Sequence, residues 1–125
     1  MTSWTAEELS RIAAADDLHV APYRADGATL GTPTWIWSVV VEDHLYVRPY
    51  HGEHSRWYQS AITQGAGQIT TAGHTYDVSF APANPTVLDA VDAAYRAKYA
   101  TSSYLAPMVA AGPRATTLRI SPTTR

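Results

Sequence analysis

Two apolar runs separated by a short turn, TWIWSVVV at residues 34–41 and HLYVRPY at residues 44–50, decide the fold. Their β-branched and aromatic residues predict a strand over residues 32–43 and another over residues 45–50, joined as a hairpin. Side chains alternate between the two faces of a strand. In the first strand, one face should carry Trp35, Trp37, Val39 and Val41, and the other should carry Thr34, Ile36, Ser38 and Val40. Because both faces are largely apolar, we expect the core to cover one and a helix or a second subunit to cover the other.

Composition limits the class of protein. The chain has 125 residues, which suits one domain with one core, and we expect a single domain over residues 1–125. Charged residues make up 16% and the net charge is -2, which argues against a nucleic-acid partner and leaves neutral surface for an oligomer interface. No cysteine, no apolar leader and no run near the roughly 18 apolar residues of a membrane span are present, so we expect a cytoplasmic protein without membrane contact.

Periodicity places the other elements. A capping box of Thr5 and Glu8 starts a helix that ends near Ala15, and a strand follows over residues 17–24. We expect helices over residues 55–64, from Asn84 onward, and over residues 103–112, with Asp92 and Arg96 as an ion pair on the solvent side of the second. A hairpin over residues 67–83 and a last strand over residues 117–121 complete the pattern. The predicted fold is α+β, mainly β: a six-stranded antiparallel closed or split barrel with flanking helices.

The second strand of the hairpin suggests a binding site. One of its faces carries His44, Tyr46, Arg48 and Tyr50, which places Arg48 between two tyrosines. A guanidinium group suits both phosphate binding and stacking on aromatic rings, whereas an ion pair with Glu42 at the sheet edge is the plainer interpretation. Trp35 and Trp37 are either core residues or the wall of a pocket for a flat ligand.

The loop HGEHSRW at residues 51–57 offers a second clue. Ser55 caps the predicted helix, whose free N–H groups, together with Arg56, can hold an anion; an ordinary capped turn is the alternative. His51, Glu53 and His54 lack the spacing of a metal-binding helix, so we predict no metal site. The chain also lacks the G-x-S-x-G, G-x-G-x-x-G and P-loop motifs.

The run GTPTWIWSVVVEDHLYVRPYHGEHSRWY, residues 31–58, resembles the central hairpin of the flavin-binding split barrels. That superfamily includes the pyridoxine phosphate oxidase-like proteins and the deazaflavin-dependent nitroreductases. The matching features are Gly31, Pro33, Trp35 to Trp37, Leu45 to Arg48, and Gly52 to Tyr58. The later runs ITTAGHTYDVSFAPA, YRAKY and LRISP resemble the next hairpin, final helix and final strand of these proteins. The chain is most similar to a bacterial family of uncharacterised small proteins within the superfamily.

The resemblance implies a homodimer that binds flavin mononucleotide (FMN) or a deazaflavin in a groove at the dimer interface, as a small-molecule redox protein. Arg48, Ser55 and Arg56 would hold the phosphate, and the ring would be walled by Trp35, Trp37, Tyr46 and Tyr50. His51 and His54 are the available acid–base candidates near neutral pH. The chain departs from the family because its basic groups here are limited to Arg24, Arg48 and Arg56. The alternatives are a cofactor-free binding protein, a cofactor-independent enzyme with an aromatic-lined apolar pocket, or a structural dimer module.

Overall fold

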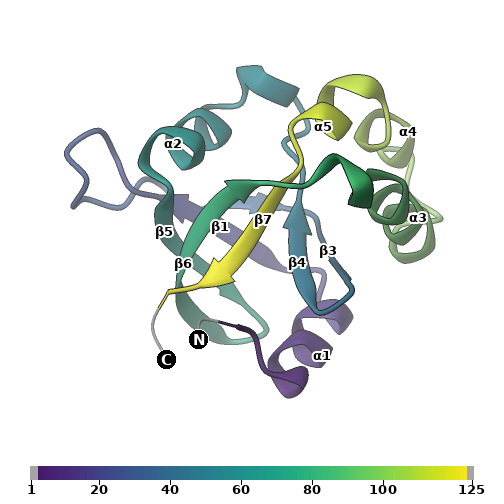
Figure 1. The fold of residues 1–125 in the computed structure, drawn as a ribbon, viewed down its shortest axis with the longest axis horizontal. Helices are drawn as coiled ribbons and strands as arrows, with labels where there is room; N and C mark the ends of the chain where they lie inside the picture. The colour runs from purple at the N-terminus through teal and green to yellow at the C-terminus, as the bar shows by residue number, and fades with distance from the viewer. Residues whose placement is uncertain (1–2, 124–125) are drawn as a thin grey trace.

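The computed structural model describes residues 3–123, which form an antiparallel sheet of seven strands curled into a nearly closed barrel (Figure 1). The strands are β1 (Leu18–Pro22), β2 (Thr34–Ile36), β3 (Ser38–Val41), β4 (His44–Val47), β5 (Ala66–Thr71), β6 (His74–Pro82) and β7 (Leu118–Pro122). The helices are α1 (Ala6–Ala14), α2 (Arg56–Gln64), α3 (Leu88–Lys98), α4 (Leu105–Met108) and α5 (Ala111–Ala115), with short 3-10 turns η1 (Gly52–His54) and η2 (Pro85–Val87). The α+β class, mainly β, is confirmed.

The prediction of six strands was wrong because the strand expected over residues 32–43 is divided at Trp37. The strand order is β2-β1-β5-β6-β7-β4-β3, so its two halves lie at opposite ends of the sheet. β2 pairs with β1, whereas β3 pairs with β4. β2 and β3 are connected in the chain through Trp37 alone. The two edge strands of the sheet therefore meet at Trp37, and this brings the sheet close to a closed barrel.

Side chains of α3 and of Tyr99, the residue directly after it, form hydrogen bonds with the backbone where the strand is divided. The Tyr95 hydroxyl donates to the carbonyl of Trp37 at 3.3 Å, and the Lys98 ammonium donates to the carbonyl of Ser38 at 2.8 Å. The Tyr99 hydroxyl accepts from the amide of Ser38 at 3.2 Å, and its ring stacks parallel to Trp37 at 4.0 Å. Buried backbone groups need such partners, so α3 takes the place of a neighbouring strand at this point.

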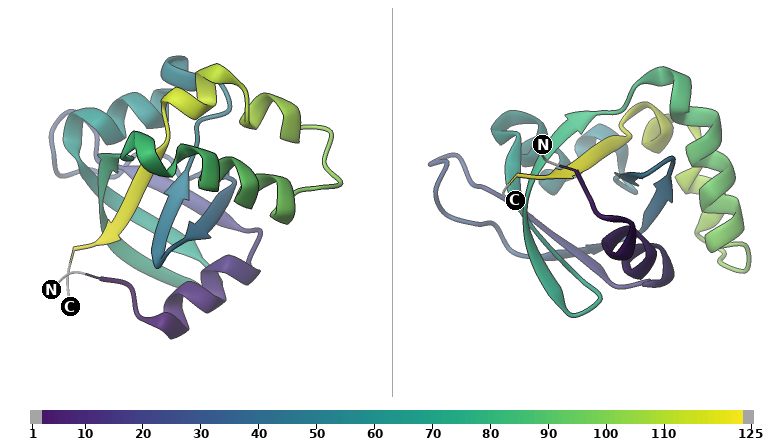
Figure 2. Two further views of the ribbon diagram at one scale, coloured as in Figure 1. Left: turned by 45° about the vertical axis from the view of Figure 1, so that its right-hand side comes forward. Right: turned by 60° about the horizontal axis from the view of Figure 1, so that its bottom comes forward.

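Two apolar clusters cover the two faces of the divided strand, as its alternation predicts. Ile36 belongs to the barrel interior, and Val40 packs against it. Val39 on the other face is buried with Val91 and Tyr95 of α3. Figure 2 shows α3 lying along the outer side of β3 and β4, while α1 lies at one end of the barrel. A helix therefore covers the outer apolar face from Trp37 to Val41, and this part does not require a second subunit, whereas Trp35 on the same predicted face remains exposed.

The close approach of β1 and β5 at Gly67 gives a test of the barrel. A Cβ atom at Gly67 would lie 2.5 Å from the carbonyl oxygen of Ala21 and 2.6 Å from Cα of Pro22, and both are backbone atoms. We expect Gly67→Ala to lower the free energy of unfolding by about 1–3 kcal/mol through overpacking. Gly112→Ala is the matched control, because a Cβ there meets no atom within 4 Å. Thermal unfolding followed by circular dichroism measures both, and equal melting temperatures would contradict the β1–β5 spacing.

Candidate functional site

The barrel opens beyond Trp37, and a cavity of about 690 Å³ occupies the opening. This volume is within the range of roughly 300–1,000 Å³ found for ligand pockets. The lining comes from β2, the segment after β4, the start of α2 and the chain around α4: Thr34, Trp35, Ile36, Trp37, Arg48, Tyr50, His51, Ser55, Arg56, Trp57, Ser102, Tyr104 and Met108. Below, this cavity is called the split pocket.

Aromatic side chains form the mouth of the split pocket. Trp35 is 54% exposed, and its indole N–H donates to the carbonyl of Asp16 at 3.0 Å, which holds the ring in place. Tyr50 and Tyr104 meet edge to face with ring centroids 5.9 Å apart. In residues 3–123, four large apolar side chains are exposed, and these three line the pocket; the fourth is Ile62. Exposed apolar surface is thus concentrated at this opening, as is usual for a binding site.

Arg48 is fully buried in the inner wall of the split pocket. Its Nε donates to the hydroxyl of Thr117 at 2.9 Å, and its Nη1 donates to the carbonyl of Met108 at 3.0 Å. Its Nη2 makes a longer contact of 3.4 Å with the carbonyl of Leu88. An oxygen of Asp92 lies 2.6 Å from Nη1 and neutralises the charge. Each nitrogen of the guanidinium therefore has an internal acceptor.

The expectation of an edge arginine between two tyrosines was wrong. β4 ends at Val47, and α3, α4 and α5 cover the chain beyond it, so Arg48 is enclosed rather than exposed. Its carboxylate partner is Asp92 of α3 and not Glu42. Because its donors are occupied, Arg48 can shape the split pocket but is poorly placed to hold a ligand phosphate.

Asp92 joins two arginines. Its second oxygen lies 2.5 Å from Nη1 of Arg114, and Nη2 of Arg114 lies 2.9 Å from Asp89. Asp92 is buried, which corrects the prediction that it pairs with Arg96 on the solvent side of the helix. Hydrogen bonds to Asp89 and Asp92 raise the pKa of Arg114 above its ordinary value. Two cations face two anions in this group, so it contributes little net charge to the pocket.

Tyr95 lies under the same group. Its ring is buried, with the guanidinium carbon of Arg48 5.2 Å from the ring centroid. Burial raises the pKa of Tyr95 far above its ordinary value, and the nearby Arg48 charge only partly opposes this. The hydroxyl therefore stays protonated and remains the donor to the carbonyl of Trp37.

The start of α2 forms the polar end of the split pocket. Ser55 occupies the N-cap position and is only 9% exposed, yet its hydroxyl makes no capping bond and no other hydrogen bond within residues 3–123. The first amide bonded along the helix is that of Gln59, to the carbonyl of Ser55 at 3.1 Å, so the earlier amides have no helical acceptor. Arg56 is exposed beside them and makes no ion pair in the described chain. No acidic residue is among the residues that line the pocket, so no lining carboxylate opposes the cation of Arg56 and the dipole at the start of α2.

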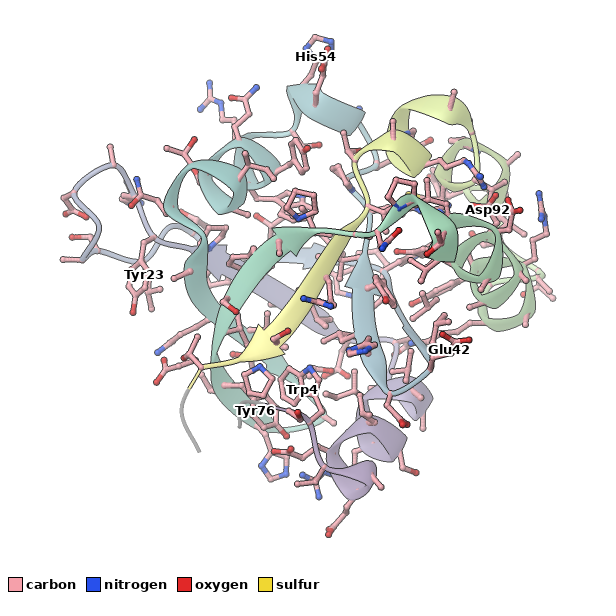
Figure 3. All side chains as sticks on the ribbon, viewed as in Figure 1. Trp4, Tyr23, Glu42, His54, Tyr76 and Asp92 are labelled. Atoms are coloured by element: carbon pink, nitrogen blue, oxygen red, sulfur yellow. The ribbon has the colours of Figure 1, made fainter. Side chains whose placement is uncertain are left out.

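The split pocket brings together most of the predicted site residues: Trp35, Trp37, Arg48, Tyr50, His51, Ser55 and Arg56. Tyr46 and His54 are not among them. Tyr46 is buried in the cluster under α3, and burial raises its pKa. His54 projects from η1 away from the barrel (Figure 3).

The wall formed by Ser102, Tyr104 and Met108 was not predicted. This part of the chain lines the same pocket as residues 34–37 because the chain reverses direction after α3 and α4 packs against α3. Local sequence patterns do not predict such a long-range contact. The one available clue was the exposed aromatic residue Tyr104, which lies in a polar turn.

Residues 3–123 hold no group of three or more His, Asp or Glu side chains placed to bind a metal ion. Within the same range, no helix has both the length and the apolar character needed to cross a bilayer.

The buried Arg48–Asp92 pair can be tested against its exposed neighbour. We expect Asp92→Ala to lower the free energy of unfolding by about 3–5 kcal/mol, because it leaves the buried Arg48 charge without a counterion. Asp89→Ala makes the same chemical change on the exposed partner of Arg114 and should leave stability nearly unchanged. Urea denaturation measures both variants. Equal losses, or none in either, would show that Arg48 is not neutralised by Asp92.

No curated protein matches the chain. A family model described as "uncharacterized protein conserved in bacteria (DUF2255)" matches residues 8–120. The sequence-based expectation of an uncharacterised bacterial family agrees with this match, and the near-closed antiparallel barrel agrees with the expected fold class, with seven strands in place of six. Membership of the flavin-binding superfamily stays a prediction. The match covers nearly all of the described residues, and the chain belongs to the bacterial family DUF2255.

Proposed function

We propose that the protein binds a flat organic anion in the split pocket. The observation that carries this proposal is the start of α2, where the hydroxyl of Ser55, which has no partner within residues 3–123, and the cation of Arg56 line an aromatic-walled cavity. Helix N-termini bind anions through their free amides and their dipole. The aromatic walls suit a planar group, because ring faces stack well on one another.

The walls of the split pocket support a planar ligand in particular. The ring of Trp37 is fixed by its parallel stack on Tyr99, and the ring of Trp35 is fixed by its bond to Asp16. Fixed rings lose little conformational freedom when a ligand binds between them, so more of the contact energy appears as affinity.

FMN or a deazaflavin is the first ligand to test, and it would make the protein an oxidoreductase. The residues fit such a group at both ends, although not as the sequence suggested: Ser55, Arg56 and the α2 amides would hold the phosphate without Arg48. Trp35, Trp37 and Tyr50 would wall the ring without Tyr46. The cofactor supplies the redox chemistry when bound, and the chain orients it and limits its contact with water. His51, which lines the pocket, is then the candidate to exchange a proton.

The second candidate is a cofactor-free binding protein or a cofactor-independent enzyme. The observation that favours it is the charge of the split pocket, where Arg48 is neutralised and Arg56 is the one lining cation without a carboxylate partner in the described chain. Such a site matches an aromatic carboxylate as well as it matches a phosphate.

Binding of FMN and of riboflavin, which lacks the phosphate, gives the test. We expect wild-type protein to bind FMN, and Ser55→Ala and Arg56→Ala each to weaken it by about tenfold, or about 1.4 kcal/mol. Riboflavin binding should change little in either variant. Arg24→Ala is the matched control, because Arg24 is exposed and outside the split pocket. Calorimetric titration measures all four proteins; wild type that binds neither flavin nor deazaflavin would favour the cofactor-free candidate.

We also propose that the protein forms a homodimer, with the exposed rings of Trp35, Tyr50 and Tyr104 at the mouth of the split pocket as part of the interface. Burying these rings against a second copy would remove apolar surface from water. Light scattering at high micromolar concentration should then give about twice the chain mass of 13.6 kDa. A mass of one chain would contradict the dimer and leave the pocket proposal intact.

A further inference from the structure

Two backbone hydrogen bonds at the C-terminal end of β1 show which of its residues bond to β2 and which bond to β5. The amide of Tyr23 donates to the carbonyl of Ala66 at 3.1 Å, on the β5 side. The carbonyl of Pro22 instead accepts from the amide of Gly31 at 2.9 Å, on the β2 side. Backbone groups of successive strand residues point to opposite sides. The even-numbered residues of β1 therefore bond toward β2, and the odd-numbered residues bond toward β5.

This alternation fixes which residue of β2 faces outward. Val20 pairs with Thr34 and Leu18 pairs with Ile36, so Thr34 and Ile36 exchange hydrogen bonds with β1. Trp35 lies between them, and its backbone N–H and C=O must point away from β1. No strand lies on that side, since β2 is at one end of the strand order.

The residues that follow Trp35 show which partners are found for backbone groups on the side away from β1. Val39 pairs with Tyr46 of β4, and the carbonyl of Trp37 accepts from Tyr95 instead of from a strand. The segment that follows β4 does not continue alongside Trp35. Trp35 and Tyr50 of that segment instead line the split pocket. Within residues 3–123, Trp35 makes one hydrogen bond outside the sheet, through its indole ring, so its backbone N–H and C=O have no partner.

We infer that the ligand of the split pocket is a lactam or imide heterocycle whose adjacent N–H and C=O pair with the backbone C=O and N–H of Trp35. The inference rests on the proposed function and names the chemical class of the flat part of the ligand. A backbone pair that loses water without gaining a partner costs free energy, so a ligand lacking this edge binds less well. A peptide strand fits less well, because strand addition uses several residues and β2 offers one outward-facing residue.

The ligand arm of the test uses two neutral rings, lumiflavin and the same ring methylated on its imide nitrogen. Neither carries a phosphate, so Ser55 and Arg56 do not decide the result. The methyl group removes the ring N–H that would donate to the carbonyl of Trp35. We expect the methylated ring to bind wild-type protein at least about tenfold more weakly by calorimetric titration.

The protein arm compares Trp35→Pro with Trp35→Ala. Both variants lose the indole ring, and only proline also loses the backbone N–H, which lies outside the β1–β2 ladder, where proline is tolerated. We expect Trp35→Pro to bind lumiflavin about tenfold more weakly than Trp35→Ala does. If proline disrupts the fold by circular dichroism, the two rings on wild type still decide. Equal binding of both rings would overturn this inference and leave the pocket; failure of both to bind would overturn the inference together with the planar-ligand proposal beneath it.

Discussion

The buried charge of Arg48 is the constraint on which the outer layer of helices depends. An unpaired ion in a protein interior costs several kcal/mol, so a buried guanidinium requires acceptors around it. Those acceptors come from α3, from α4 and from the segment before β7, through Asp92, the carbonyl of Met108 and the hydroxyl of Thr117. Neutralising one charge therefore holds three separate parts of the chain against the end of β4, and one of them carries the Tyr104 wall of the split pocket.

The division of one predicted strand into β2 and β3 at Trp37 explains both the near closure of the barrel and the position of its opening. At Trp37 the chain exchanges one neighbouring strand for another, and this leaves backbone groups unpaired on both sides of the exchange. On the side of Ser38, Lys98 at the end of α3 and Tyr99 directly after it satisfy them. On the side of Trp35 nothing in the described chain does, and the cavity lies there. The pocket is thus the part of the split that the helices leave uncovered.

Local patterns in the sequence predict local features of this structure well. The faces of residues 34–41, the capping box at Thr5 and the left-handed glycine that ends α2 at Gly65 all follow from neighbouring residues. The division at Trp37 does not, because alternation shows which face a side chain occupies but not which strand lies beside it. The burial of Arg48 was not predicted for a related reason. Asp92 lies four residues before Arg96, so the sequence favoured a pair within the helix, whereas the structure pairs Asp92 with the distant Arg48.

Neutralisation of Arg48 also changes where ligand recognition must come from. With that charge occupied, an anionic ligand of the split pocket would be held, among the described residues, by Arg56, the hydroxyl of Ser55 and the first amides of α2. The planar part of a ligand would instead be recognised from β2, by the ring and the backbone of Trp35. Charge and shape are then recognised by two separate elements, each held independently by the barrel. A ligand that satisfies both has one orientation in the pocket, because reversing it would place its charge against a strand that offers no cation.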